Sequence, residues 1–312
     1  MFAAGKAVRG GIPIIFPWFG PNRRAPSAPQ HGFARTATWH LDGVETAGTE
    51  SLMLTLSLGD NDVGSQFWPE PFHAIYTVTF ARPLSLRLVV QNRATHPITF
   101  EEALHSYFAV SDVTAVAISG LAGTTYLDKT EGARRKQETA PLVTVGAETG
   151  RVYLDTPARC AIEDGRWCRR VLIEKHGAAS TVVWNPWAEK GAAMADLGDP
   201  IWRGMVCVET GNVADNEVRL AAGWRTPDVG GDLRRCRPVI FSGASTVGWR
   251  TDLPGLVRYH VCAPMPAISR TAIERVVAKE PRTSDHIAGA VFVTEDFATG
   301  FLTRVARRDR AA

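Results

Sequence analysis

The stretch SLMLTLSLG, residues 51–59, indicates the fold class. Leucine occupies every second position from Leu52 to Leu58, and serine, methionine or threonine stands between the leucines. Successive side chains of a β-strand point to opposite faces, so this period of two predicts a strand with one face in a hydrophobic core. The Gly-Asp-Asn triplet at residues 59–61 then predicts a turn.

The same alternation returns along most of the chain. Leu84–Val90 repeats it, and further strand-like runs are Ala74–Phe80, Ile98–Leu104, Val113–Ser119, Arg151–Asp155, Arg169–Lys175, Ser180–Trp184 and Met205–Glu209. About ten short strands with almost no helix between them are typical of an antiparallel sandwich or barrel. Parallel strands would need long crossover connections, for which the chain has no room. We therefore expect an all-β domain.

Residues 9–39 differ from these runs. They hold five prolines and several aromatic residues, among them Trp18, Phe19 and Phe33. Proline cannot donate a hydrogen bond to a neighbouring strand and is excluded from central strands. The segment is therefore predicted to be a long, stiff loop, and such loops tend to carry function.

Alternation fades after residue 222, where glycine, proline and arginine become dense. Only Thr271–Lys279 shows helical spacing of its apolar residues. We predict a β-sandwich domain over residues 1–222. Residues 223–312 are expected to be an atypical tail, largely disordered or loosely helical, with little contact with the sandwich.

Composition excludes several classes of protein. The chain has 312 residues, a net charge of +3 and no dominant Lys/Arg block, so no nucleic-acid partner is expected. Its five cysteines have irregular spacing without a CxxC motif, which favours reduced thiols over a metal site. No signal peptide or apolar run of about 18 residues occurs, so we expect a cytoplasmic protein without a membrane contact.

Two segments of the proline-rich loop carry candidate binding residues. RGGIPIIFPWFGP (residues 9–21) contains Arg9, and QHGFART (residues 30–36) contains Gln30, His31 and Arg35. A planar guanidinium suits a phosphate group, so both arginines are candidates for one dianion. The alternatives are a surface arginine at a strand end and a solvated or capping histidine.

EEALHSYF, residues 101–108, is an unusually polar strand segment. In a strand, His105 shares a face with Glu101, Ala103 and Tyr107. A polar row inside a sandwich needs partners or a ligand. Histidine titrates near neutrality and suits proton transfer, so His105 is either a catalytic or a structural, hydrogen-bonded residue.

Two carboxylates, Glu209 and Asp128, are further candidate site residues. Glu209 ends the apolar run of MVCVETGN (residues 205–212), where burial would raise its pKa toward the range of a general base; the alternative is a solvated strand end. Asp128 in TYLDK either holds sugar hydroxyls or forms a turn. Glu101 and Glu102 are sequence neighbours on opposite strand faces, so they cannot flank one glycosidic bond. The catalytic triad order, the phosphate-binding glycine loop and the HExxH motif are also absent from the sequence.

Together these segments resemble the aldose 1-epimerase superfamily, and within it the glucose-6-phosphate 1-epimerase (hexose-6-phosphate mutarotase) branch. The matching strings, in family order, are AVRGGIPIIFPWFGP, HGFAR, FWP, ALHSYF, SGLAGTTYLDK, WNPW and VCVET. They span roughly residues 6–222.

The resemblance implies a galactose-mutarotase-like antiparallel β-supersandwich that interconverts the α and β anomers of a hexose 6-phosphate without a metal or cofactor. It implies that His105 is the general acid and Glu209 the general base. It further implies that Arg9 and Arg35 bind the phosphate, and that Asp128 binds sugar hydroxyls with Gln30 or His31 nearby. Family members carry several strands before the RGG segment, so we expect an N-terminally truncated sandwich with open strand edges. The tail beyond residue 222 has no match in the family.

Two other functions stay open. One is a non-catalytic sugar-phosphate-binding protein on the same fold, and the other is a sandwich-fold lyase or hydrolase, for which we find no suitable residue set. The presence of both His105 and Glu209 favours the enzyme, since a pure binding protein has no need of an acid and a base. The expected partner is a small sugar phosphate, and the expected state is a monomer.

Overall fold

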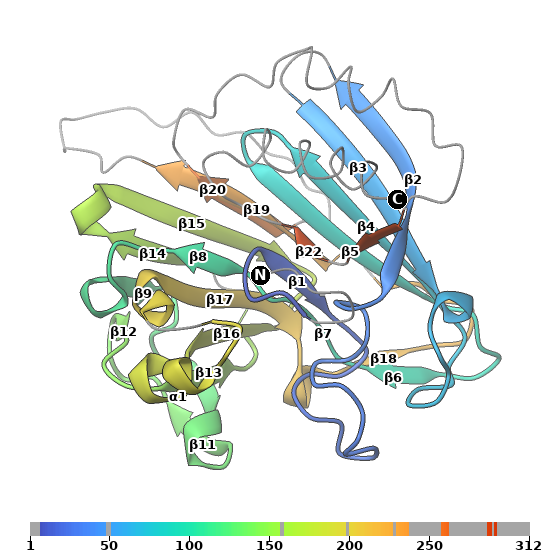
Figure 1. Ribbon diagram of the computed structural model, residues 1–312, viewed down its shortest axis with the longest axis horizontal. Helices are drawn as coiled ribbons and strands as arrows, with labels where there is room; N and C mark the ends of the chain where they lie inside the picture. The colour runs from blue at the N-terminus through green and yellow to red at the C-terminus, as the bar shows by residue number, and fades with distance from the viewer. Residues whose placement is uncertain are drawn as a thin grey trace.

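The alternating segments form strands in two large sheets. The computed structural model describes residues 7–47, 51–156, 159–197, 200–226, 229–236, 257–261, 286–288 and 290–291. Pairings between the named strands are antiparallel, apart from a single parallel residue pair between β19 (Val229–Cys236) and β20 (Val257–Val261). One helix, α1 (Trp187–Ala193), and several short 3-10 turns accompany the strands in this part of the chain. The all-β expectation is confirmed (Figure 1).

The first sheet carries the candidate residues. Its strands, in spatial order, are β11 (Arg134–Gln137), β10 (Thr125–Asp128), β13 (Thr149–Tyr153), β16 (Ser180–Asn185), β17 (Met205–Asn212), β7 (Glu102–Leu104), β1 (Ile12–Ile15) and β22 (Ala290–Val291). A further strand, β8 (Tyr107–Ala109), also pairs with β17. Strand β17 is buried along its whole length, so side chains on both of its faces lie inside the protein.

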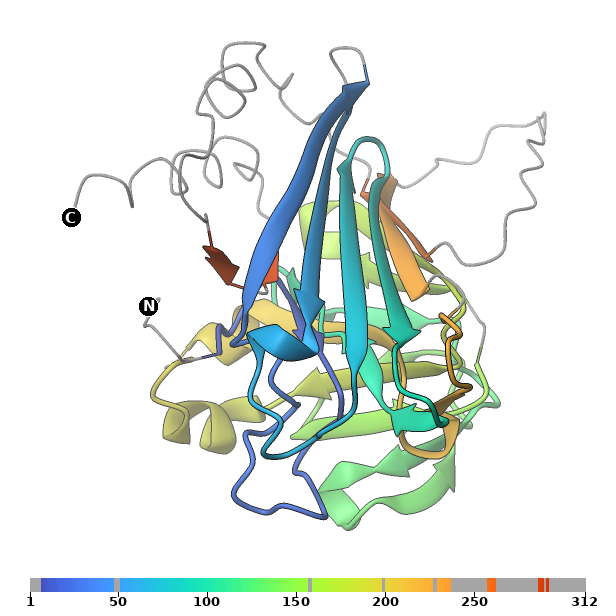
Figure 2. The same ribbon diagram turned by 90° about the vertical axis from the view of Figure 1, so that its right-hand side faces the viewer.

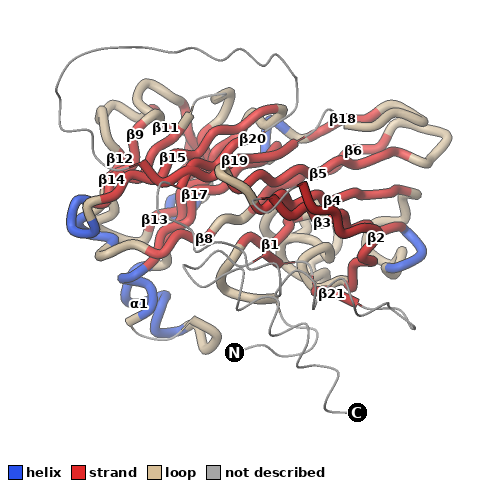
Figure 3. The backbone as a smooth tube through the Cα atoms, turned by 90° about the horizontal axis from the view of Figure 1, so that it is seen from above, coloured by secondary structure: helices blue, strands red, loops and turns tan. Residues whose placement is uncertain are grey.

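The second sheet has 11 strands and holds the meander that the leucine pattern predicts. In spatial order they are β12 (Val143–Thr144), β9 (Ala117–Ser119), β14 (Cys160–Asp164), β15 (Arg169–His176), β19 (Val229–Cys236), β20 (Val257–Val261), β5 (Leu84–Asn92), β4 (Phe72–Phe80), β3 (Ser51–Gly59), β2 (Thr38–Ala47) and β21 (His286–Ala288). Figure 2 shows β2 to β5 side by side, and Figure 3 shows the row from above. A small separate ribbon joins β6 (Ile98–Phe100) to β18 (Val218–Leu220).

A single large core joins the two sheets. Alternate leucines of β3 and β5 belong to the same hydrophobic cluster as Ile14, Val183 and Val208 of the first sheet. The other face of the first sheet carries a smaller cluster around Ile15 and Val182. The middle of the first sheet, around β16, β17, β7 and β1, is therefore apolar on both faces, and a charged group there must find a partner or a ligand.

The prediction that residues 9–39 are a loop throughout is wrong near both ends, because Thr38 and Trp39 already belong to β2. Ile12–Ile15 forms β1, which pairs with β7 and β22 although it contains Pro13. Proline fits here because its carbonyl still accepts a hydrogen bond, from the His105 amide at 3.0 Å. Its ring nitrogen carries no hydrogen, so no backbone donor is left without a partner at this position.

We expected residues 223–312 to make little contact with the sandwich, but β19 and β20 pair with its strands. The backbone of β19 pairs with β15 and β5, and β20 pairs with the same two strands. Without these strands, β15 and β5 would leave their backbone donors and acceptors unpaired at that position. The expected helix Thr271–Lys279 lies outside the described residues. No helix in the described ranges is long and apolar enough to cross a membrane.

Glu102 on β7 is a buried carboxyl group within the first sheet. It is 0% exposed; its Oε1 accepts from Asn212 at 3.2 Å, and its Oε2 has no partner. Burial raises the pKa of Glu102 to about 7 from an ordinary value of 4.5. The folded protein therefore holds this proton at a pH where the unfolded chain has lost it, and stability falls as the pH rises through that window.

The Glu102→Gln variant should remove this pH dependence. Relative to the wild type, its free energy of unfolding should rise by about 3 kcal/mol between pH 4.5 and pH 7, because one pKa unit corresponds to about 1.4 kcal/mol. Urea unfolding of both proteins at several pH values measures the difference. Glu163→Gln, at a partly exposed carboxylate, is the control. A stability difference between Glu102→Gln and the wild type that stays constant with pH would contradict the assignment.

Candidate active site

His105 and Glu209 meet within the first sheet. His105 lies in the two-residue break between β7 and β8, and both strands pair with β17, which carries Glu209. The break is held by its backbone: the His105 amide donates to Pro13 O at 3.0 Å, and the Val208 amide donates to Ser106 O at 3.3 Å. His105 Nε2 lies 3.3 Å from Glu209 Oε1, and the two side chains are 7% and 1% exposed. The two residues predicted as acid and base are therefore in contact.

Burial sets the charge state of this pair. It raises the pKa of Glu209 well above its ordinary value, and the nearby Arg35 only partly offsets this. It also lowers the pKa of His105 well below its ordinary value, and His31, Arg35 and Arg9 lower that pKa further. Both pKa shifts favour the neutral forms of His105 and Glu209, in which the shared proton lies on the Glu209 carboxyl group. Glu209 Oε2 and His105 Nδ1 are buried without a hydrogen-bond partner.

Aromatic rings fix the orientation of His105. Its imidazole stacks on Tyr107 with ring centroids 4.8 Å apart and planes 10° apart. The Trp184 ring stands edge-on to it at 6.0 Å, and the His31 ring at 5.7 Å. Tyr107 was expected on the face of His105 but without a role, and Trp184 was not singled out as a site residue. Strand pairing places Trp184 at the site, because it lies opposite Cys207, two residues before Glu209 on β17.

The backbone of the HGFAR segment is held next to the first sheet by hydrogen bonds to one carbonyl group, that of Phe16. Phe16 O accepts from the amides of Phe33 at 3.0 Å and Ala34 at 3.3 Å. Gly32 has φ +71°, and a Cβ there would lie 1.9 Å from Phe16 O, so only glycine fits. His31 beside it also has a positive φ of 64°, a conformation that a side chain rarely adopts unless its surroundings impose it.

His31 is a neutral hydrogen-bond donor in this arrangement. Burial lowers its pKa to about 3, and the positive charges of Arg35, Arg9 and Lys129 contribute. Its Nδ1 accepts from the Gly20 amide at 3.2 Å, which leaves the proton on Nε2. Three cations around a neutral histidine are a suitable setting for an anion.

Arg9 and Arg35 both lie near the His105–Glu209 pair, but they differ in their hydrogen-bond partners. Arg9 Nε donates to Asp196 Oδ2 at 2.9 Å, and its guanidinium also hydrogen-bonds Tyr107. Arg35 Nη2 donates to Gln30 O at 2.6 Å, whereas Arg35 Nε is buried without a partner. Gln30 thus supports Arg35 through its main chain, while its own side chain is exposed. Arg35 is the guanidinium with an unused donor.

Lys129 is a site residue that the sequence reasoning missed. A Cβ at Gly150 would lie 3.3 Å from Lys129 Cβ and 3.9 Å from the Trp184 ring, so the stem of Lys129 passes over this glycine beside Trp184. Its charge also contributes to lowering the pKa of His31. The signal in the sequence was its position: Lys129 follows Asp128 in TYLDK and therefore points to the other face.

Asp128 does not join the site, because strand alternation directs it to the wrong face. The register aligns Glu209 with Val182, Val152 and Leu127 across β17, β16, β13 and β10. Asp128 belongs to the adjacent row, which continues through Arg151, Val183 and Val208. Residues of adjacent rows point to opposite faces of a sheet.

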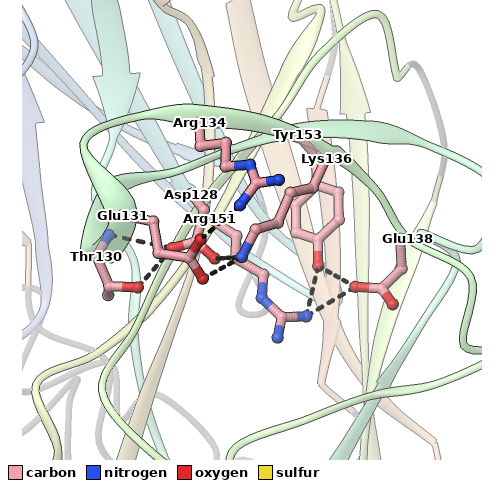
Figure 4. Close-up of polar contacts among 8 residues, drawn as sticks. All are labelled: Asp128, Thr130, Glu131, Arg134, Lys136, Glu138, Arg151 and Tyr153. Carbon is pink, nitrogen blue, oxygen red and sulfur yellow. Dashed lines mark hydrogen bonds and ion pairs between the residues drawn. The ribbon is translucent and has the colours of Figure 1, made fainter.

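The Asp128 carboxylate is fully occupied on that other face. Its Oδ1 accepts from the amide and hydroxyl of Thr130 at 3.1 and 2.6 Å, and its Oδ2 pairs with Lys136 at 2.8 Å. Figure 4 shows Lys136 between Asp128 and Glu131, beside a separate network of Glu138, Arg151 and Tyr153. The role expected for Asp128 in binding sugar hydroxyls is therefore replaced by the turn-forming alternative.

Comparison with known proteins agrees with this geometry. A relative from Cenchrus ciliaris, "Putative glucose-6-phosphate 1-epimerase", is 34% identical over 72% of this chain and 70% of its own length. A protein of the same name from Salmonella typhimurium is 34% identical over 67% of this chain and 69% of its own length. The crystal structure of a "putative mutarotase (YeaD)" from Salmonella typhimurium superposes with a TM-score of 0.67 at 30% identity, covering 74% of this chain and 75% of that one.

The family model that matches the chain is described as aldose 1-epimerase. It covers residues 1–228, which include every candidate site residue from Arg9 to Glu209. Family membership and the antiparallel supersandwich therefore agree. The chain belongs to the aldose 1-epimerase family and is an isomerase that acts on sugar anomers.

Proposed function

We propose that this chain interconverts the α and β anomers of a hexose 6-phosphate, with glucose 6-phosphate as the preferred substrate. The observation that carries the proposal is the buried contact of 3.3 Å between His105 Nε2 and Glu209 Oε1, with Arg9, Arg35 and Lys129 close by. The pair supplies an acid and a base, and the cations supply a place for a dianion.

The reaction needs one proton acceptor and one donor. In the ring-opening step, Glu209 takes the proton of the anomeric hydroxyl, the electron pair of that O–H bond forms the carbonyl, and the bond from C1 to the ring oxygen breaks. His105 then gives its proton to the ring oxygen. After the aldehyde rotates, the two steps run in reverse and close the ring on the other face. Each proton transfer contributes typically 10²–10⁴-fold to the rate.

The neutral pair favoured by burial performs the same chemistry with the roles exchanged. Glu209 then donates the proton to the ring oxygen, and His105 accepts the proton of the anomeric hydroxyl. Both forms of the pair carry one proton, so neither needs a proton from solvent during the turnover. Tyr107 and Trp184 hold the imidazole plane for either direction.

Phosphate recognition is supported by two hydrogen-bond donors at the site. Arg35 Nε is a buried donor without a partner, and the proton of His31 lies on Nε2. A buried unpaired donor is costly unless a ligand satisfies it. The names of the relatives from Cenchrus ciliaris and Salmonella typhimurium point to the same substrate class.

Neutral isosteres at the pair should remove catalysis and keep binding. For Glu209→Gln and His105→Asn we expect kcat/KM for glucose 6-phosphate to fall 10²–10⁴-fold, because each change removes one proton transfer. Magnetisation transfer between the two anomeric protons in NMR measures the rate. Binding of glucose 6-phosphate, followed by calorimetry, should persist. His96→Asn at an exposed histidine is the control. Unchanged anomer exchange in both pair variants would contradict the proposal and favour a binding protein.

Removing the charge of Lys129 should act on the phosphate and leave the chemistry intact. In Lys129→Met we expect KM for glucose 6-phosphate to rise about tenfold with kcat within about twofold, since a charged hydrogen bond contributes roughly 1.5–3 kcal/mol. Lys136→Met is the matched control, because Lys136 lies in the same hairpin but pairs with Asp128 and Glu131 on the other face. Equal KM values in the wild type and Lys129→Met would remove Lys129 from the phosphate site.

A further inference from the structure

Cys207 is a buried thiol at the centre of the site that proton transfer does not use. It precedes Glu209 by two residues on β17 and points to the same face. Its register partners are Trp184 on β16 and Tyr107 on β8, the two residues whose rings frame His105. It is 0% exposed.

Cys207 completes a set of three potential metal ligands. One ligand atom each of His105, Cys207 and Glu209 lies within 4.8 Å of the other two. In a tetrahedral zinc site, bonds of about 2.0–2.3 Å place ligand atoms roughly 3.5 Å apart. The distance of 3.3 Å between His105 Nε2 and Glu209 Oε1 already meets this value. The thiolate needs only a small side-chain adjustment to do the same.

Two independent features indicate that this set accepts a ligand. Glu209 Oε2 is buried without a hydrogen-bond partner, so a carboxylate oxygen is available beside the imidazole. The donor set of one nitrogen, one sulfur and one oxygen is that of zinc, because thiolate selects soft or borderline cations. Magnesium prefers six oxygen ligands and does not fit.

The surroundings indicate an inhibitory ion rather than a resident one. A histidine that permanently holds zinc usually donates its second ring N–H to a carboxylate or carbonyl, and this partner tightens the site. His105 Nδ1 has no such partner. Bound metal would occupy the His105 lone pair and the Glu209 carboxylate, which are the groups that move the proton.

We propose that His105, Cys207 and Glu209 form a reversible binding site for a thiophilic divalent cation such as Zn²⁺, and that its occupancy inhibits anomer exchange. The inhibition rests on the proposed function, whereas the binding does not. Zn²⁺ should compete with the sugar, because both need the same imidazole and carboxylate.

Cobalt titration of the full-length protein tests the binding without reference to activity. Co²⁺ should give a thiolate-to-cobalt charge-transfer band and the visible bands of a tetrahedral site, and Zn²⁺ should displace it. Cys207→Ser should lose the charge-transfer band and bind Zn²⁺ at least tenfold more weakly. Cys168→Ser, at the exposed thiol, should keep both properties. Cys207→Ala provides a second variant, and circular dichroism checks the fold of each.

Inhibition is measured on the same proteins. Zn²⁺ should slow anomer exchange of glucose 6-phosphate in the wild type, and a chelator should restore it. The rate of Cys207→Ser, compared with the metal-free rate of the same variant, should resist Zn²⁺. A charge-transfer band that survives in both Cys207 variants would overturn the proposal, as would the absence of any such band in the wild type. A Cys207-dependent band in a wild type without anomer exchange would support the metal site and overturn the proposed function alone.

Discussion

The site depends on one constraint: a histidine and a glutamate are buried against each other in the middle of the first sheet, which is apolar there on both faces. Water does not compensate the charges there, so desolvation drives both groups toward their neutral forms. Such a pair is destabilising unless it serves a ligand. The break between β7 and β8 turns His105 toward Glu209, and the Pro13 carbonyl holds that break from the neighbouring strand. Part of the proline-rich start of the chain is therefore a strand that also supports the backbone of His105.

Electrostatics separate the chemistry from recognition. Arg9, Arg35 and Lys129 come from three different segments and lie around His31, whose pKa is lowered first by burial and then by these charges. Beside the larger effect of burial, Arg35 and Arg9 also lower the pKa of His105, and Arg35 partly offsets the burial that raises the pKa of Glu209. A phosphate dianion at this position would offset the cations and shift the proton equilibrium of the pair. In the proposed reaction, different residues would therefore bind the phosphate and transfer the proton, and charge would link the two events.

The sequence was sufficient for the fold class and for singling out His105 and Glu209, which the structure brings into contact, because alternation and polar residues inside apolar strands are local signals. Their roles as acid and base stay predictions. Four features were beyond it. Pro13 entered a strand because its carbonyl, not its nitrogen, faces the partner. Asp128 was expected at the site but lies on the opposite face of the sheet, whereas Lys129, for which no role was predicted, lies beside Trp184. Trp184 and Cys207 reach the site only through cross-strand pairing, which local patterns do not reveal. The pairing of β19 and β20 is likewise a long-range property.

The most direct measurement is two-dimensional NMR exchange of the wild-type protein with glucose 6-phosphate, and with free glucose as the comparison. The account predicts accelerated exchange between the anomeric protons of glucose 6-phosphate, with kcat/KM at least tenfold above that for glucose. This ratio follows from the three cations that only the phosphate engages. No acceleration with either sugar, or equal acceleration with both, would contradict it.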